Sequence, residues 1–334
     1  MSVVLVTGAT GLVGSHLVER LQRDGWHVRA LVRDRSRAGW LSSHGVERRD
    51  GDTQDAAAFI RAAEGAQFVF HCAAAITPRG GWEAYRAPNI DGTRNAIEAA
   101  AAAGARLLHL SSVAVYGPAG RYALSRGTGL QELQPLLPIP GDAWYSRSKR
   151  ESEELVMAAH RAGRVWATAV RPCVIYGPRD RQFVPRIASL LRLPLAPRIG
   201  DGRAVLSIVH ARSVAEVAVL AVTSEIGAGR AYNVTNDLPM TVGEFYEAAQ
   251  LGLGRRVRWV PVPGPVAQGA LAIAGTVLRL LRVPGSALLN STSLDFLLQD
   301  SPFSSERARQ ELGWTSTLDP RVAVAEAFRD ALVR

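Results

Sequence analysis

The sequence predicts an α/β protein built on a doubly wound parallel sheet, with a smaller lobe formed by the C-terminal part of the chain. Three observations support this fold class. Short apolar runs alternate with longer helical patterns through the first half, a turn with three glycines follows the first run, and beyond Pro172 the pattern breaks into pieces marked by Pro and Gly. Strands that alternate with helices form parallel sheets with both faces covered. A chain of 334 residues is long enough for such a sheet and a second lobe.

The elements follow from these patterns in chain order. The apolar runs predict core strands over 3–7, 28–32, 67–73, 105–112, 165–172 and 229–235. The helical patterns predict helices near 12–24, 55–64, 83–103 and 144–162. We therefore expect a first domain over 1–172 with returning segments near 205–235, and a smaller substrate lobe made of 173–204 and 236–334.

Composition excludes several classes of protein. The 39 Lys and Arg against 30 Asp and Glu give a formal charge of +9, but the arginines are scattered singly along amphipathic segments. Without a long basic block and interleaved aromatic residues, we expect no nucleic acid partner. A basic balance does suit anionic ligands such as phosphates. No cluster of metal-ligating residues stands out, so we expect no metal.

The cysteines, the first residues and the lengths of the apolar runs predict the cellular compartment of the protein. Cys72 and Cys173 both lie in strand-like runs, which is typical of buried free thiols in a reducing compartment. Met1 leads directly into a strand pattern, so we expect a cytoplasmic protein without a secretory leader. No apolar run reaches the roughly 18 residues of a spanning helix. The run at 265–282 is a core helix or a peripheral membrane contact.

The glycine turn predicts a dinucleotide site of the Rossmann type. Gly8, Gly11 and Gly14 lie between a strand and a helix. The first glycine allows a tight turn, the second lets the backbone approach a pyrophosphate, and the third lets helix and strand pack closely. The new helix offers its unpaired N–H groups to the phosphates. Thr10, Leu12 and Val13 share this turn.

The residues after the second strand favour NADP(H) over NAD(H). Enzymes that hold the ribose 2′-hydroxyl of NAD place a carboxylate there, but Val32 stands at that position and Arg33 follows it. A guanidinium suits a 2′-phosphate. An ordinary exposed arginine is the alternative interpretation. Asp52 and Thr53, in "RDGDTQD", follow a further strand that we expect between Arg33 and Asp52.

A serine, a tyrosine and a lysine form the candidate catalytic set. Tyr145 and Lys149 are four residues apart at the start of a predicted helix, which puts both side chains on one face. A neighbouring ammonium favours the phenolate, so Tyr145 can act as acid or base near neutral pH. Ser112 ends a core strand, where its hydroxyl can polarise a carbonyl oxygen. Ser111 is either a second donor or only a strand residue.

Together these motifs resemble the extended short-chain dehydrogenase/reductase superfamily, also known as the NAD-dependent epimerase/dehydratase superfamily. The glycine spacing, the strand end "HCAAA", "NIDGT", the Ser–Tyr–Lys set and "RPCVIYGP" carry the resemblance. It implies that Tyr145 donates or accepts the proton, that Lys149 holds the nicotinamide ribose and that Ser112 orients the substrate oxygen. It adds six residues to the expected cofactor site, namely Cys72, Ala73, Ala74, Asn89, Pro172 and Val174. Of these, Asn89 has two equally favoured roles, which are to support the sheet and to contact the cofactor.

The same superfamily contains nucleotide-sugar enzymes and oxidoreductases. Nucleotide-sugar members often carry an Asn near Val174 and an Arg–Asp pair where this chain has Leu206 and Ser207. Without those anchors a bound diphosphate would be poorly neutralised. "YNVTNDLPMTVGEF" and the apolar stretch after Pro265 resemble the branch of 3β-hydroxysteroid dehydrogenases, sterol-carboxylate dehydrogenases and 2-alkyl-3-oxoalkanoate reductases.

We therefore expect an NADP(H)-dependent oxidoreductase that acts on the secondary alcohol or ketone of an apolar small-molecule substrate. An NAD-dependent nucleotide-sugar epimerase or dehydratase is the alternative, and a non-catalytic redox sensor is less favoured because Tyr145 and Lys149 are both present. The resemblance also implies a homodimer whose interface is formed by helices 83–103 and 144–162.

Overall fold

The computed structural model describes residues 2–76, 80–117, 131–236, 238–270, 273 and 291–333, in two compact units. Unit 1 comprises residues 1–173, 211–235 and 303–315, and unit 2 comprises residues 174–210, 236–302 and 316–334. The expected division differs from these units in two places: residues 205–210, expected in the segment that returns to the first domain, belong to unit 2, and residues 303–315 belong to unit 1. Residues 303–315 join unit 1 because the Thr235 N–H donates to Ser305 Oγ and helix α13 (Glu306–Leu312) packs on the strand that ends at Val234.

Unit 1 is built on a seven-stranded parallel sheet, as the sequence predicts. The strand order is β10-β6-β5-β4-β1-β2-β3. The strands are β1 (Val3–Thr7), β2 (His27–Val32), β3 (Glu47–Asp50), β4 (Phe68–His71), β5 (Arg106–Leu110), β6 (Ala167–Pro172) and β10 (Ala231–Val234). From β1 the chain adds strands in one direction and then crosses to β4 to add the rest in the other. Ligands of such sheets bind at the carboxyl ends of the strands beside this crossover.

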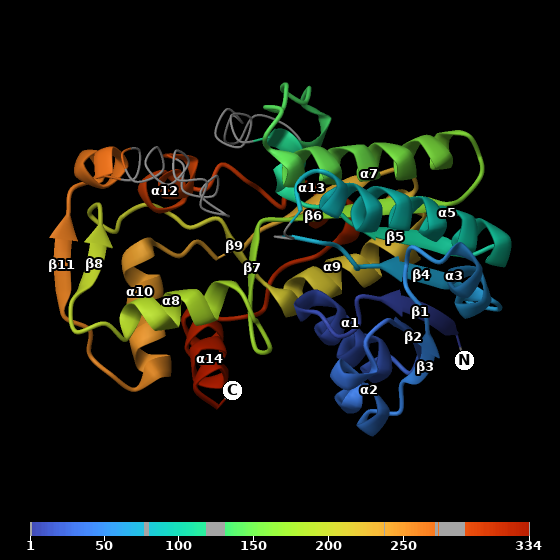
Figure 1. The fold of residues 1–334 in the computed structure, drawn as a ribbon, viewed down its shortest axis with the longest axis horizontal. Coiled ribbons are helices and arrows are strands. Elements are labelled where there is room, and N and C mark those ends of the chain that lie inside the picture. The colour runs from blue at the N-terminus through green and yellow to red at the C-terminus, as the bar shows by residue number, and fades with distance from the viewer. Residues whose placement is uncertain are drawn as a thin grey trace. The chain divides into compact units, whose positions relative to one another are not determined.

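Helices cover both faces of this sheet (Figure 1). Helices α1 (Leu12–Arg23) and α9 (Ala211–Thr223) pack together on one face. Helices α3 (Ala56–Ala63), α5 (Gly92–Ala103) and α7 (Trp144–Arg161) pack side by side on the other. Leu5, Phe59, Ile97 and Val156 meet in a core between the second set of helices and the strands. The short helix α2 (Gly39–Ser43) lies before β3.

The predicted helix over 83–103 is interrupted. It consists of α4 (Glu83–Arg86), a π-helical turn over Ala87–Asp91, and α5. Pro88 lies in this turn and has no N–H to donate, which breaks the regular hydrogen-bond ladder of an α-helix.

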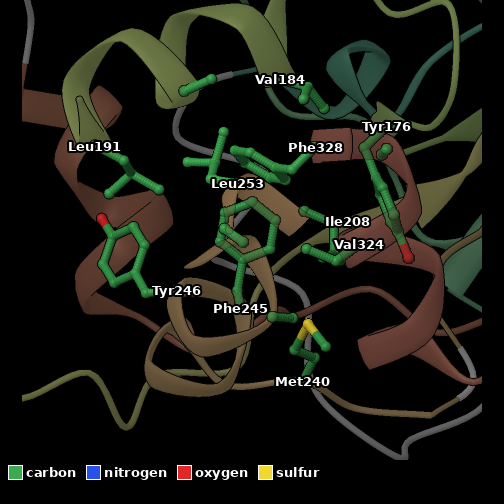
Figure 2. Packing of buried hydrophobic residues seen from close by; sticks show 14 of the residues in the cluster. Tyr176, Val184, Leu191, Ile208, Met240, Phe245, Tyr246, Leu253, Val324 and Phe328 are labelled. Carbon is green, nitrogen blue, oxygen red and sulfur yellow. The ribbon is translucent and has the colours of Figure 1, made fainter. Parts of the chain in front are cut away.

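Unit 2 contains two small parallel pairs of strands and helices that enclose an apolar core. Strand β7 (Val174–Tyr176) pairs with β9 (Ile208–His210), and β8 (Ala196–Ile199) pairs with β11 (Trp259–Val262). Its helices are α8 (Phe183–Leu191), α10 (Val242–Leu253), α12 (Ser291–Leu298) and α14 (Pro320–Val333). Figure 2 shows aromatic and aliphatic side chains in this core, with Phe245 and Phe328 edge to face at a centroid distance of 5.7 Å.

Among the helices that the structure describes, none is both long and apolar enough to cross a membrane. Most of the 265–282 run lies outside the described residues, so its predicted membrane contact stays a prediction.

Candidate active site

The turn between β1 and α1 has the geometry of a pyrophosphate cradle. Gly8 adopts a φ of +69°, and a Cβ there would come within 2.8 Å of the Ala73 N atom. A Cβ on Gly14 would lie 2.1 Å from the Gly8 carbonyl oxygen. Two of the glycines are therefore needed for the close approach of β1, α1 and the end of β4.

Gly11 differs from these two glycines because it is exposed. It is the N-cap of α1, and within the described turn 8–14 no side chain caps this end of the helix and its first turn contains no acidic residue. A helix start with uncovered N–H groups attracts an anionic group. A dinucleotide pyrophosphate therefore fits this end, where Thr10 and Leu12 are partly exposed and Val13 is buried.

The end of β2 provides a cation next to a carboxylate. Arg33 Nη1 lies 3.3 Å from Asp52 Oδ2, and the Arg33 side chain is 73% exposed. Partial burial raises the pKa of Asp52. The hydrogen bond from the Gln54 N–H and the charge of Arg33 lower it, and together they outweigh the effect of burial, so the net shift is downward. Asp34, the nearest carboxylate after β2, accepts hydrogen bonds from the N–H and the hydroxyl of Ser36.

The end of β3 is held against α5. Asn95 Nδ2 donates to the carbonyl oxygen of Thr53 at 2.8 Å, and Thr53 packs against Gly92. This contact keeps Asp52 and Thr53 beside the carboxyl end of β2, the place expected for the adenosine part of a dinucleotide.

The candidate catalytic helix is fixed to the end of β5 by two side chains. Lys149 Nζ donates to the Leu110 carbonyl oxygen at 2.8 Å, and Arg150 Nε donates to the Val115 carbonyl oxygen at 2.8 Å. Ser112 lies between these two acceptors. Lys149 and Ser112 therefore come from the same junction of β5 and α7, and Tyr145 is on α7 one turn before Lys149.

Burial lowers the pKa of Lys149 at this junction. Lys149 is only 3% exposed, and this burial lowers the pKa of its amine to about 8, while the nearby Cys72 and Glu153 act in the opposite direction. One of its N–H donors is used by Leu110, so two remain for ribose hydroxyls. Burial also raises the pKa of Cys72 to about 12, so this thiol stays protonated. Both cysteines are free, as the sequence predicts.

Ser112 is arranged to donate a hydrogen bond. Its Oγ accepts from the Ala114 N–H at 3.1 Å and caps the short 3₁₀ turn Val113–Tyr116. The hydroxyl hydrogen can then be directed to a substrate oxygen. Ser111 is 3% exposed, and its buried hydroxyl has no hydrogen-bond partner among the described residues.

A continuous hydrogen-bond chain connects the glycine turn with the backbone of Tyr145. The Ala73 N–H donates to Thr7 Oγ1, which contacts His71 Nδ1 at 3.0 Å. His71 Nε2 contacts Thr93 Oγ1 at 3.2 Å, and the Thr93 hydroxyl donates to the Asn89 carbonyl oxygen. Because the Thr93 hydrogen is used there, His71 donates from Nε2 and accepts at Nδ1 as a neutral ring.

The second half of this chain runs through the Asn89 side chain. Its Oδ1 accepts from the Ala75 N–H, and its Nδ2 donates to the Ala75 carbonyl oxygen and to Ser148 Oγ. The Ser148 hydroxyl then donates to the carbonyl oxygen of Tyr145 at 2.9 Å. Both N–H donors of Asn89 are used within the protein, so Asn89 braces the end of β4 against α7.

The structure brings most of the predicted site residues to one edge of the sheet in unit 1. The glycine turn, Arg33, Asp52, the 72–74 segment, Asn89, Ser112, Tyr145 and Lys149 all follow or face carboxyl ends of its strands. Pro172 ends β6 on the same edge. Val174 instead begins β7 in unit 2.

Sequence reasoning did not assign roles to Thr7, His71, Thr93 and Ser148. A polar residue inside an otherwise apolar strand was the available signal at Thr7 and His71. Across the described residues, no group of three His, Cys, Asp or Glu side chains is arranged to hold a metal ion.

Comparisons with known proteins show the family of the chain. The model of the NAD dependent epimerase/dehydratase family matches residues 4–235. A 2-alkyl-3-oxoalkanoate reductase of Stenotrophomonas maltophilia is 30% identical over 98% of this chain and 97% of its own length. A 3β-hydroxysteroid-dehydrogenase/decarboxylase of Arabidopsis thaliana is 28% identical over 97% of this chain, which spans only 60% of that longer protein.

Among solved structures, the crystal structure of gox2253 superposes over 100% of this chain and 97% of its own, with a TM-score of 0.74 and 26% sequence identity. The chain thus belongs to the NAD dependent epimerase/dehydratase family, the extended short-chain dehydrogenases/reductases, and the family implies an NAD(P) cofactor.

Proposed function

We propose that this extended short-chain dehydrogenase/reductase is an NADP(H)-dependent oxidoreductase that interconverts a ketone and a secondary alcohol on an apolar small molecule. The observation that carries the proposal is the fixed junction of β5 and α7, which presents Ser112, Tyr145 and Lys149 next to a dinucleotide cradle. The names of the relatives, which refer to a hydroxysteroid and to a 3-oxoalkanoate, support an apolar carbonyl substrate.

The chain's own residues have distinct roles in this reaction. When bound, the nicotinamide supplies or accepts the hydride at the substrate carbon. The Ser112 O–H donates to the substrate oxygen and orients it. The Tyr145 hydroxyl delivers the proton to that oxygen in the reducing direction and removes it in the oxidising direction. The Lys149 ammonium binds ribose hydroxyls and favours the tyrosine anion that remains after proton transfer.

Charge at the end of β2 supports NADP(H) as the cofactor. Arg33 is largely exposed, and its guanidinium can leave the exposed contact with Asp52 at small cost, because exposed ion pairs contribute little. The Asp34 carboxylate is engaged by Ser36, so it offers little to a ribose 2′-hydroxyl. Replacement of Arg33 by Ala should weaken NADPH binding by about 10- to 100-fold and leave NADH binding nearly unchanged.

The two positions where a nucleotide-sugar enzyme often carries an Arg–Asp pair are uncharged in this chain and lie in unit 2. Leu206 is 3% exposed and belongs to the core that Figure 2 displays in part. Ser207 is also buried. Neither residue offers a cation to a diphosphate, which favours the oxidoreductase over the nucleotide-sugar enzyme.

A substrate panel tests the proposal. Ketosteroids, 2-alkyl-3-oxo acids and nucleotide sugars are incubated with NADPH, and the loss of its absorbance is followed. Turnover of an apolar ketone that disappears in Tyr145→Phe is the expected result. Turnover of a nucleotide sugar alone would favour the alternative function, and a wild-type preference for NADH in kcat/KM would contradict the role of Arg33.

A further inference from the structure

Part of unit 2 combines arginines and leucines with a complete lack of acidic residues. No Asp or Glu occurs between Arg181 and Gly200, a segment that contains four arginines. None occurs between Ala248 and Leu294 either, where five arginines lie among mostly apolar residues. Residues 155–179 also lack Asp and Glu, but there Arg164 pairs with Glu98 and the buried Arg171 pairs with Glu153. Within these two segments of sequence, no acidic residue offsets the charge of the arginines.

The fold brings the two segments together at one end of the β8–β11 pair. The loop Arg192–Leu195 leads from α8 into β8, and the loop 254–258 leads from α10 into β11 (Figure 1). Arg255 Nη1 donates to the Arg192 carbonyl oxygen at 3.1 Å, and the Ala196 N–H donates to the Arg258 carbonyl oxygen at 2.9 Å. We refer to these two loops as the loop pair.

In the β8–β11 pair, the strand register directs the side chains of Pro197 and Val260 away from the core of unit 2. Trp259 is opposite Ala196 and faces the core, where its ring contacts Tyr246 at a centroid distance of 4.8 Å. Because side chains alternate along a strand, Val260 and its partner Pro197 point away from that core. Val260 is 41% exposed.

The loop pair exposes leucines and arginines side by side. Leu193 is 45% exposed and Leu195 is 58% exposed. Four arginines of the loop pair are exposed as well: Arg192, Arg255, Arg256 and Arg258. A single exposed leucine is ordinary. Two leucines among four cations, with no anion in either loop, form a surface with a specific chemical complement.

We propose that the loop pair binds the surface of an anionic lipid bilayer. Arginine guanidinium groups form strong hydrogen bonds with lipid phosphates, and their stems tolerate an apolar boundary. Leu193 and Leu195 enter the region between headgroups and acyl chains, where their burial is favourable. Basic groups near an anionic membrane add attraction that falls with salt.

The chemistry of the surface favours a bilayer over other partners. A second copy of the chain would place like charges opposite one another at this surface. A single-stranded nucleic acid stacks its bases on aromatic side chains, and Leu193 and Leu195 are aliphatic, so they would contribute little to such a complex. This proposal does not depend on the substrate or the cofactor of the enzyme.

Vesicle co-sedimentation of the full chain tests the proposal. Vesicles of phosphatidylcholine alone are compared with vesicles that also contain phosphatidylglycerol, at low and high salt. The wild type should bind the phosphatidylglycerol vesicles and lose binding at high salt. The variant Arg255→Gln/Arg256→Gln/Arg258→Gln should bind them on the order of 100-fold more weakly. The variant Leu193→Ser/Leu195→Ser, which keeps every charge, should bind at least about tenfold more weakly.

The control variant Arg23→Gln/Arg61→Gln/Arg161→Gln removes the same charge from exposed positions of unit 1 and should bind like the wild type. Circular dichroism melting confirms that each variant is folded. Three results would overturn the proposal: no binding of the wild type to phosphatidylglycerol vesicles, an equal loss in the control variant, or unchanged binding of the leucine variant. The last result, together with binding to a DNA duplex, would identify a site for polyanions in general.

Discussion

Both units have an apolar core, and unit 1 adds a row of paired polar groups to its core. Unit 1 places a row of polar groups under its strand ends, where Thr7, His71, Thr93 and Asn89 are each at most 2% exposed and are joined by hydrogen bonds. The core of unit 2 in Figure 2 is aromatic and aliphatic, with Phe245, Phe328 and Leu191 packed together.

This difference shows what each unit can contribute. Buried polar groups are directional, so a fully paired row fixes backbone and side-chain positions at the edge where the chemistry is proposed. An apolar core supplies stability without such direction, and related sequences can change its shape by repacking. We expect substitutions in an apolar core such as that of unit 2 to alter the free energy of unfolding most, and substitutions in the polar row of unit 1 to alter catalysis at smaller cost in stability.

The largest expected effect is on the core of unit 2. Phe328 is fully buried, and Phe328→Ala should lower the free energy of unfolding by about 3–5 kcal/mol, because it removes a packed ring and leaves a cavity. Urea denaturation measures this loss. Val322→Ala on the same helix, at a side chain that is 64% exposed, is the control and should change little. An equal loss in both variants would contradict the role given to the core.

The next effect concerns the proton donor of unit 1. Tyr145→Phe keeps the ring but removes the hydroxyl, so kcat should fall by about 10²-fold or more while cofactor affinity barely changes. Steady-state kinetics and a fluorescence titration with NADPH measure the two quantities. Tyr85→Phe is the matched control because its ring lies 6.5 Å from that of Tyr145. Turnover near the wild-type rate in Tyr145→Phe would show that another group moves the proton.

A smaller effect should follow from a break in the hydrogen-bond chain. Thr93→Val keeps the shape of the side chain but leaves the His71 Nε2–H and the Asn89 carbonyl oxygen without their partner. The free energy of unfolding should fall by about 1–3 kcal/mol, and kcat should fall because the Asn89 brace of α7 loosens. Thr223→Val is the control, since its hydroxyl also donates to the carbonyl four residues before it at 2.8 Å, but at the exposed last residue of α9. If kcat is unchanged in Thr93→Val, this row of hydrogen bonds supports only the fold and has no role in catalysis.

The sequence predicted six of the seven strands of the unit 1 sheet as apolar runs, and the glycine turn marked the edge at which we expect the cofactor. Strand β3 forms no apolar run because its four residues are all charged. It could not predict the contact of Thr7 with His71, since the two residues are 64 positions apart and only the parallel pairing of β1 with β4 places them together. In unit 2, strands β8 and β11 were missed because Pro197 and Pro261 interrupt their patterns. The return of 303–315 to unit 1 depends on contacts between residues far apart in the sequence, such as Ser305 with Thr235 and Arg307 with Ala231, which no periodicity reveals.

The smallest expected effect is a dependence of stability on pH that comes from the polar row of unit 1. Burial, together with the charge of Lys149, lowers the pKa of His71 from 6.5 to about 3. Below pH 6.5 the unfolded chain binds a proton at His71 that the folded chain does not, so folding becomes less favourable as the pH falls from 6.5 toward 3. The loss from this one group should reach about 1.4 kcal/mol at pH 5.5. Burial lowers the pKa of His109 well below its usual value, so His109 adds a loss of stability of the same sign.

The substitution His71→Gln, which cannot be protonated in this range, should remove the His71 part of this loss. Urea denaturation at pH 7.5 and pH 5.5 measures the free energy of unfolding at each pH. His44→Gln, at an exposed ring, serves as the control and should keep the full dependence on pH. Equal pH dependence in the wild type and in His71→Gln would mean that the folded chain admits a proton to this row, and the neutral ring required by the hydrogen-bond chain would then be wrong.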